Sequence, residues 1–283
     1  TQPTLSMQIQ KLEDQLGVQI FDRNKQPVVP TEIGKRIVEQ ARAVVEQARK
    51  VQEIVNDEKD ELAGELRIGI IPTLSPYLLP LFIHGFMEKY PKVNVTVEEL
   101  LTDQVVDKLR NEQLDIGIIV TPLVEPGMIS VPLFYELFYA YVNHREKLYQ
   151  KDILHIDDIP ENELWLLNEG HCFRDQVLNV CHIYGEHHGR FKYESGSLEA
   201  LKKIVDKHGG LTLLPELATL DFDKTSQSKL KRFVNPEPVR EVSLIVKKSF
   251  LKRKLIEALR KEILDSIPDY INVKKNGQVV KWR

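Results

Sequence analysis

Apolar residues recur every three or four positions over residues 1–57, which is the period of an α-helix. A first helix, opened by Thr1 and ended by Gly17, carries them as one stripe that we expect to be buried. That stripe consists of Leu5, Ile9, Leu12 and Leu16. Two short extended pieces around a polar turn follow at 18–30, and a second helix should run from Thr31 to about Asp57.

The second helix carries apolar residues at near-heptad spacing: Ile33, Ile37, Ala41, Val44, Ala48, Val51 and Val55. An isolated helix with so narrow a seam is unstable, so it should pair with a copy of itself or pack on its own domain, and we favour the pairing. The charged residues before Gly64 then mark a hinge at 59–64. We therefore expect residues 1–58 to form a unit ahead of a second domain at 65–283.

From Glu65 onward, short apolar segments alternate with helical patterns, which is typical of an α/β protein with parallel, doubly wound sheets. The first set predicts three strands with helices between them. The strands are 66–71, 93–101 and 116–120, and the helices run to about 90 and from 103.

A second set predicts another α/β lobe, followed by one strand and one helix that cross back to the first. Its strands are 135–142, 164–167, 191–194 and 211–214, its helix is 197–207, and the returning pair is 242–246 and 251–266. We expect lobe I over about 65–134 and 240–283, lobe II over about 135–239, and a cleft between them.

Composition and charge narrow the class of protein. The 283 residues are 42% hydrophobic and 29% charged, enough for two domains with a large core. The net charge is -3, so the chain as a whole is not basic, and any contact with DNA must come from a local basic patch. Without an apolar run of membrane-spanning length or a signal peptide, we expect a cytoplasmic protein with no membrane partner.

Both cysteines lie in one stretch of twelve residues, 170–181. If Cys172 opens a helix, nine steps place the two Cα atoms about 13 Å apart, whereas a disulfide needs them within about 7 Å. Bonding therefore requires local unwinding. In the first helical turn, the helix dipole should stabilise a Cys172 thiolate, helped by His171 and Arg174. The sequence offers one activated thiol and one distant partner.

Four functions remain open for this stretch on the residues alone. The cysteines could be buried structural thiols. They could bind zinc, although the spacing of the candidate ligands His171, Cys172, Cys181, His182, His187 and His188 argues against it. A thiol enzyme is disfavoured because adjacent helical side chains point about 100° apart. The fourth is a redox switch, in which peroxide oxidises Cys172 to a sulfenic acid and Cys181 resolves it as a disulfide.

Short motifs near the start of the chain resemble the winged helix-turn-helix of the LysR-type transcriptional regulators. They are Gln2-Pro3-Thr4-Leu5-Ser6, Leu16-Gly17, Phe21-Asp22-Arg23 and Thr31-Glu32-x-Gly34. The resemblance implies that residues 1–16 are the recognition helix and that two further helices precede it. The implied DNA-binding residues are Gln2, Pro3, Thr4, Ser6, Gln8, Lys11 and Arg23.

The cysteine stretch, together with Ser197-Leu198-Glu199 and residues 210–215, resembles the peroxide-sensing branch of that family. This implies a periplasmic-binding-protein-like effector domain in which Cys172 is the peroxidatic and Cys181 the resolving cysteine. The polar residues implied around the peroxide are Thr73, Thr102, His171, Asp175 and Arg240. From spacing alone, Thr73 and Thr102 could equally cap helices.

The resemblance also implies partners. It predicts promoter DNA, a homo-oligomer that dimerises through the long helix and forms a tetramer, a glutaredoxin or thioredoxin as reductant, and no cofactor. The main alternative is a regulator of the wider family that binds a small organic anion near Thr73, Thr102 and Ser197, with the cysteines incidental. A peroxidase-like enzyme is a third hypothesis.

Overall fold

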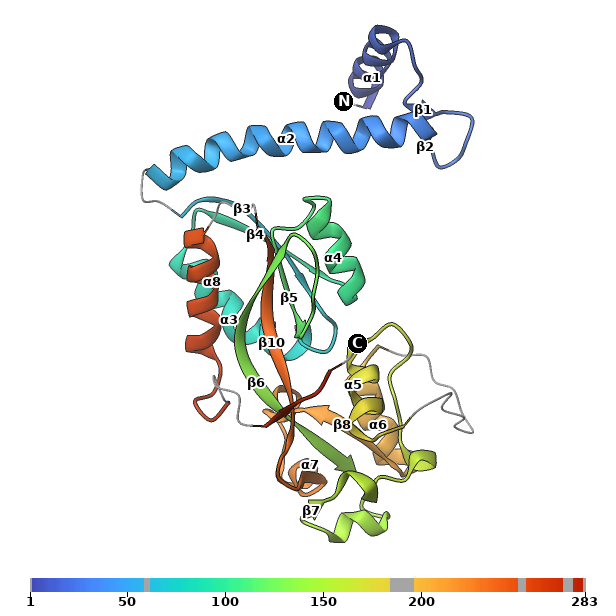
Figure 1. The fold of residues 1–283 in the computed structure, drawn as a ribbon, viewed down its shortest axis with the longest axis vertical. Coiled ribbons are helices and arrows are strands. Elements are labelled where there is room, and N and C mark those ends of the chain that lie inside the picture. Colours follow the sequence, from blue (N-terminus) through green and yellow to red (C-terminus); the bar gives the residue numbers. More distant parts are fainter. Residues whose placement is uncertain (1, 59–61, 184–195, 249–252, 272–276, 282–283) are drawn as a thin grey trace. The chain divides into compact units, whose positions relative to one another are not determined.

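The computed structural model describes residues 2–58, 62–183, 196–248, 253–271 and 277–281 (Figure 1). The chain divides into two compact units, Thr1–Glu61 and Leu62–Arg283, and each is described separately. None of the helices in the described ranges has the length and hydrophobicity needed to cross a membrane.

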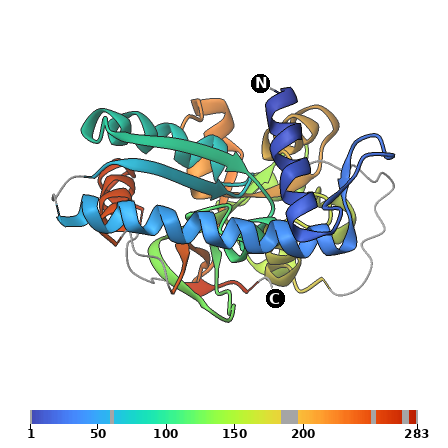
Figure 2. The ribbon, with the colours of Figure 1, turned by 90° about the horizontal axis from the view of Figure 1, so that it is seen from above.

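The first unit contains the elements that the apolar periodicity predicts. Helix α1 (Gln2–Leu16) ends at Gly17, which has a φ of 68°. Strands β1 (Phe21–Asp22) and β2 (Val29–Pro30) pair antiparallel as a small wing, and α2 (Glu32–Glu58) follows. Seen from above, α1 lies across the first part of α2 (Figure 2).

The predicted burial of the α1 stripe is wrong. Leu5, Leu12 and Leu16 are 62%, 41% and 50% exposed, because no described part of the first unit packs over this face. The seam of α2 is also open, with Val44 and Val51 more than half exposed. Such seams favour association. Dimerisation through α2 stays a prediction.

A buried carboxylate joins α1 to the wing. Glu13 is only 6% exposed and accepts hydrogen bonds from the backbone of Ile20 (2.7 Å) and Phe21 (3.1 Å). It also pairs with Arg23 Nη2 at 3.1 Å. The two backbone bonds, followed by Arg23, lower the pKa of Glu13. One buried side chain therefore ties the end of α1 to the first strand of the wing.

Gly34 is required by a close backbone approach at the start of α2. Thr31 caps this helix as predicted, since its Oγ1 accepts from Gly34 N at 2.9 Å. A Cβ on Gly34 would lie 1.9 Å from the backbone oxygen of Ile20. We therefore expect Gly34→Ala to destabilise the first unit by about 1–3 kcal/mol, as overpacking does elsewhere.

Thermal unfolding followed by circular dichroism measures this effect, and DNA binding should weaken in parallel. Lys35→Ala is the matched control, because Lys35 is 62% exposed and its ion pair is with the exposed Glu32. Equal melting temperatures for the two variants would contradict the prediction.

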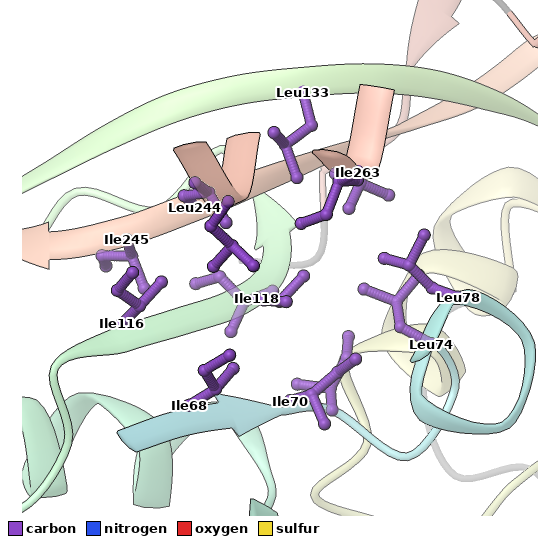
Figure 3. Packing of buried hydrophobic residues seen from close by; sticks show 14 of the residues in the cluster. Ile68, Ile70, Leu74, Leu78, Ile116, Ile118, Leu133, Leu244, Ile245 and Ile263 are labelled. Carbon is purple, nitrogen blue, oxygen red and sulfur yellow. The ribbon is translucent and has the colours of Figure 1, made fainter. Parts of the chain in front are cut away.

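The second unit begins with the predicted alternation of strands and helices. Its elements are β3 (Gly64–Ile70), α3 (Ser75–Lys89), β4 (Val93–Glu99), α4 (Thr102–Arg110) and β5 (Ile116–Thr121). Strands β4, β3 and β5 are parallel neighbours. Figure 3 shows their isoleucines packed in the core of lobe I: Ile68, Ile70, Ile116 and Ile118 beside Leu244 and Ile245.

Two long strands run through both lobes. β6 (Met128–Val142) and β10 (Pro238–Lys247) pair antiparallel, and β10 also pairs antiparallel with β5. The predicted starts at 135 and 242 are therefore too late. Pro132 interrupts the sequence pattern of β6, and the register shifts opposite it, between Val242 and Ser243. The sheets are mixed, and the two-lobed α/β architecture is confirmed.

The remaining elements build lobe II and return to lobe I. They are η1 (Lys147–Gln150), β7 (Ile153–Leu154), η2 (Ile156–Asp158), η3 (Glu161–Glu163), α5 (Cys172–Val180), α6 (Leu198–His208), β8 (Leu211–Pro215), η4 (Glu216–Thr219), α7 (Lys224–Ser228), β9 (Leu230–Phe233), α8 (Arg253–Ser266) and β11 (Gln278–Val279). Helix α8 packs on α3.

Some predictions for lobe II do not hold. The strand expected at 164–167 is reduced to one bridge between Leu164 and Leu211. The strand expected at 191–194 lies outside the described residues. The short elements α7, β7, β9 and β11 were not anticipated, because segments of two to five residues carry too little periodicity.

Candidate functional site

Helix α5 places the two cysteines at its opposite ends. His171 precedes it in extended conformation, Cys172 is its first residue, and Cys181 follows its last. Gly170, at a φ of 89°, makes the turn that leads into it. Both cysteines are free thiols, and the helical rise separates their Cα atoms by about 13 Å. The predicted helix with Cys172 in its first turn is confirmed.

The Cys172 side chain crosses from one lobe into the other. It is 4% exposed and belongs to the hydrophobic core of lobe I. The next residues of the same helix, Phe173, Val177 and Val180, belong to the core of lobe II. Cys181 is partly buried against lobe II. The helix is thus anchored in lobe II and inserts one thiol into lobe I.

A buried arginine lies beside this junction. Arg240, on β10, has no exposed surface, and its Nε donates to Glu136 Oε1 at 2.7 Å. Its Nη1 and Nη2 donate to the Oγ1 and backbone oxygen of Thr73, each at 3.1 Å. The guanidinium also lies over the ring of Phe173, 5.3 Å from its centroid. Arg240 therefore joins Thr73 to the surroundings of Cys172, whose pKa its charge lowers, and the role of both residues in a peroxide pocket stays a prediction.

Thr102 supplies a second polar group at the thiol. It is 3% exposed, and its Oγ1 makes no hydrogen bond of good geometry to any described residue. It lies close enough to the Cys172 thiol to lower its pKa. Neither Thr73 nor Thr102 caps a helix, because the positions before α3 and α4 are Leu74 and Leu101. Both hydroxyls are turned to the junction instead.

His171 directly precedes Cys172, and Asp175 lies one turn further along α5. His171 is 7% exposed, and burial lowers its pKa, so its imidazole is neutral at pH 7 and above. The imidazole packs against Gly196, where a Cβ would come within 2.6 Å of Nε2. Asp175 is half-buried, and its charge raises the pKa of Cys172.

The expectation of a stabilised thiolate is wrong. Burial is the largest influence on Cys172 and raises its pKa, and the opposing effects of Thr102 and Arg240 do not outweigh it. Arg174 does not support a thiolate either, since its Nη1 donates to the Leu167 carbonyl at 3.1 Å. Burial also raises the pKa of Cys181, to about 12. Both cysteines are neutral thiols at rest.

Within the described ranges, no three His, Cys, Asp or Glu side chains lie close enough together to hold a metal ion. His182 follows α5 with a φ of 52°. Two members of the zinc alternative, His187 and His188, lie outside the described residues.

The residues predicted to contact DNA lie in α1 and the wing. Thr4, Ser6, Gln8 and Lys11 are exposed on α1, and Arg23 is half exposed beside Glu13. Gln2 and Pro3 belong to α1, but their side chains lie outside the described part of the structure.

Two residues at the junction were missed from the sequence. Glu136 is the counter-ion of Arg240, and a carboxylate within an apolar strand pattern was the signal that could have found it. Tyr77 of α3 donates to Glu199 of α6 at 2.9 Å and so joins the two lobes. Neither partner could be paired from sequence spacing.

Comparison with known proteins agrees with this architecture. Residues 59–268 match the LysR substrate binding domain, and residues 1–35 match the bacterial regulatory helix-turn-helix protein of the lysR family. The chain is 31% identical to the hydrogen peroxide-inducible genes activator of Haemophilus influenzae, over 96% of this chain and 90% of that protein.

Solved structures are similar over most of the chain. A full-length OxyR variant from Pseudomonas aeruginosa has a TM-score of 0.77, with 35% identity over 97% of this chain and 90% of that one. An OxyR variant from Corynebacterium glutamicum with hydrogen peroxide bound has a TM-score of 0.68 and 25% identity, over 94% of this chain and 84% of that one. The chain therefore belongs to the LysR family of transcriptional regulators, as a relative of the OxyR peroxide sensors, and is a regulator and not an enzyme.

Proposed function

We propose that this regulator senses hydrogen peroxide through Cys172 and that a reversible Cys172–Cys181 disulfide changes its oligomer arrangement and promoter binding. The observation that carries the proposal is the insertion of one thiol, from a helix with a second thiol at its far end, into a buried polar junction. The Thr102 hydroxyl there lacks a good hydrogen-bond partner among the described residues. A peroxide molecule could supply one.

The pocket residues have distinct roles in this proposal. Thr73, Thr102 and Arg240 can donate hydrogen bonds to peroxide oxygens beside the thiol. His171, which is neutral, and Asp175 can accept the thiol proton and return it to the leaving hydroxide. The peroxide-bound Corynebacterium glutamicum relative, which has a similar fold, supports a ligand of this size.

The reaction balances with peroxide as the oxidant. The Cys172 thiolate attacks one oxygen, the O–O bond breaks, and hydroxide takes a proton to leave as water. The resulting sulfenic acid is attacked by the Cys181 thiolate, so that the S–O bond breaks, the S–S bond forms and a second water leaves. The two cysteines lose two electrons, which peroxide gains. A glutaredoxin or thioredoxin would return them, and no cofactor takes part.

Disulfide formation couples to structure because the two thiols are too far apart in the helix. Closing about 13 Å of helical rise to within about 7 Å requires α5 to unwind. It also requires Cys172 to leave the core of lobe I. We infer that this repacking alters contacts in a homo-oligomer, a dimer through α2 and a tetramer overall, and so moves the α1 helices on promoter DNA.

Peptide mass spectrometry after near-stoichiometric peroxide tests the proposal. We expect a 172–181 crosslink in the parent protein, a persistent sulfenic acid in Cys181→Ser, and no peroxide response of promoter binding in Cys172→Ser. A parent protein without the crosslink, or a Cys172→Ser variant that still responds, would overturn peroxide sensing.

The organic-anion alternative has less support from the geometry. Thr73 Oγ1 already accepts from Arg240, and Ser197 Oγ accepts from Ala200 N at the start of α6. Ser197 therefore serves as the cap of α6, and the positive charge of Arg240, which an organic anion would need, is already neutralised by Glu136.

A further inference from the structure

We propose that residues 277–281 act as a strap that keeps α5 helical while both cysteines are reduced, and that this strap must release before the disulfide can form. The second half of the proposal rests on the proposed function, whereas the first half does not. The strap is defined here as the segment from Gly277 to Lys281.

One edge of the strap is fixed to β10. Strand β11 pairs parallel with it, and Gln278 N donates to the Glu237 carbonyl at 3.0 Å. Val280 N donates to the Val239 carbonyl at 2.9 Å. Val239 directly precedes Arg240, so the strap attaches next to the buried arginine of the site.

The other edge of the strap faces α5. Gln176 Nε2 donates to the Val280 carbonyl at 3.0 Å, and Asn179 Nδ2 donates to the Lys281 carbonyl at 2.7 Å. Gln176 and Asn179 are three residues apart and therefore share one face of the helix. The segment thus forms hydrogen bonds to β10 with its backbone N–H groups and to α5 with its carbonyl oxygens.

Packing reinforces these bonds. Val280 is 8% exposed and belongs to the same core as Val177 and Val180 of α5. A helix of nine residues is too short to be stable alone and depends on tertiary contacts. Because the strap contributes both hydrogen bonds and an apolar side chain, it should be one of the main supports of α5.

The position of the two donors links the strap to the redox change. Gln176 and Asn179 both lie between Cys172 and Cys181, within the stretch that must unwind. When they move, the carbonyls of Val280 and Lys281 lose their partners, and the buried Val280 carbonyl is left unsatisfied. The hydrogen bonds between the strap and α5 therefore oppose the unwinding of α5.

Amide hydrogen exchange of the reduced, full chain tests the support of α5 without peroxide. We expect a chain shortened after Gly277 to exchange at least tenfold faster over 172–181, with β3 and β5 unchanged. The matched control is a chain shortened after Lys281, which keeps every contact described above. Equal exchange in α5 for both shortened chains would overturn the strap.

A single substitution tests the same point if the shortened chain does not fold. Asn179→Ser keeps a similar helix propensity but is too short to reach the Lys281 carbonyl. Asn179 is exposed, so the core is untouched. We expect faster exchange in α5, by about threefold to tenfold, and unchanged exchange would count against the proposal.

Rapid-quench mass spectrometry tests the link to the switch. Shortening after Gly277 should speed conversion of the sulfenic acid to the disulfide about tenfold while leaving sulfenic acid formation unchanged. An unchanged conversion rate would refute the coupling. If the parent forms no disulfide at all, the proposed function fails, and the exchange experiment alone then decides whether the strap supports α5.

Discussion

Replacing Glu136 by Gln is expected to lower the free energy of unfolding of the second unit by about 3–5 kcal/mol. Glu136 and Arg240 are both without exposed surface and meet at 2.7 Å. The glutamine would leave the Arg240 charge buried without a carboxylate partner, although the hydroxyl and carbonyl of Thr73 and the ring of Phe173 would still contact it. Glu136 Oε2 also accepts from Leu217 N at 2.9 Å, which adds to the loss.

Chemical denaturation of the reduced protein, followed by circular dichroism, measures this change. Glu237→Gln is the matched control, since it also breaks a glutamate–arginine pair. Glu237 and Arg232 meet at 2.6 Å, but Arg232 is 57% exposed. We expect that control to lose less than about 1 kcal/mol. The double variant with Arg240→Met should regain much of the stability, because it removes the unpaired charge. Similar losses for Glu136→Gln and Glu237→Gln would contradict the prediction.

The rate of Cys172 oxidation by peroxide is expected to rise about tenfold from pH 7 to pH 8. Burial raises the pKa of Cys172 above its ordinary value, so the thiolate is a small fraction throughout this range. Below the pKa, that fraction grows tenfold with each unit. His171 stays neutral across the range because burial lowers its pKa, so its titration does not change the pH dependence of the rate.

The Cys181→Ser variant isolates this reaction, and labelling of the sulfenic acid at several pH values gives the rate. Thr102→Val should slow the reaction at every pH, since the hydroxyl that lowers the pKa of Cys172 is removed. A rate that is flat between pH 7 and pH 8 would mean that the thiolate is already formed, as the position at the helix start alone suggests.

Local pattern was enough to predict the main elements of the fold. Helices α1 and α2, the parallel strands of lobe I and helix α6 follow from periodicities within single segments. The long strands β6 and β10 were predicted to start too late. Pro132 interrupts the strand pattern of β6, and the register of β10 shifts opposite this proline.

Sequence reasoning named several residues of the candidate site but missed Glu136 and Tyr77 and mispredicted the electrostatics of Cys172. Arg240 binds Thr73, and both Arg240 and Thr102 influence the Cys172 thiol, whereas the peroxide pocket that the motif resemblance implied stays a prediction. The sign of the Cys172 pKa shift was wrong, because the helix dipole is a local effect whereas burial depends on which lobe the side chain enters.

The sequence by itself determined the family, the main helices and strands of the first unit and of lobe I, and the helical separation of the two cysteines. Each of these depends on residues that are neighbours in the chain. The tertiary structure alone decided that Cys172 is a buried neutral thiol, that Glu136 neutralises Arg240, and that Gln176 holds the carbonyl of Val280. The Glu136–Arg240 and Gln176–Val280 pairs each join residues 104 positions apart, a distance over which no local pattern fixes a partner.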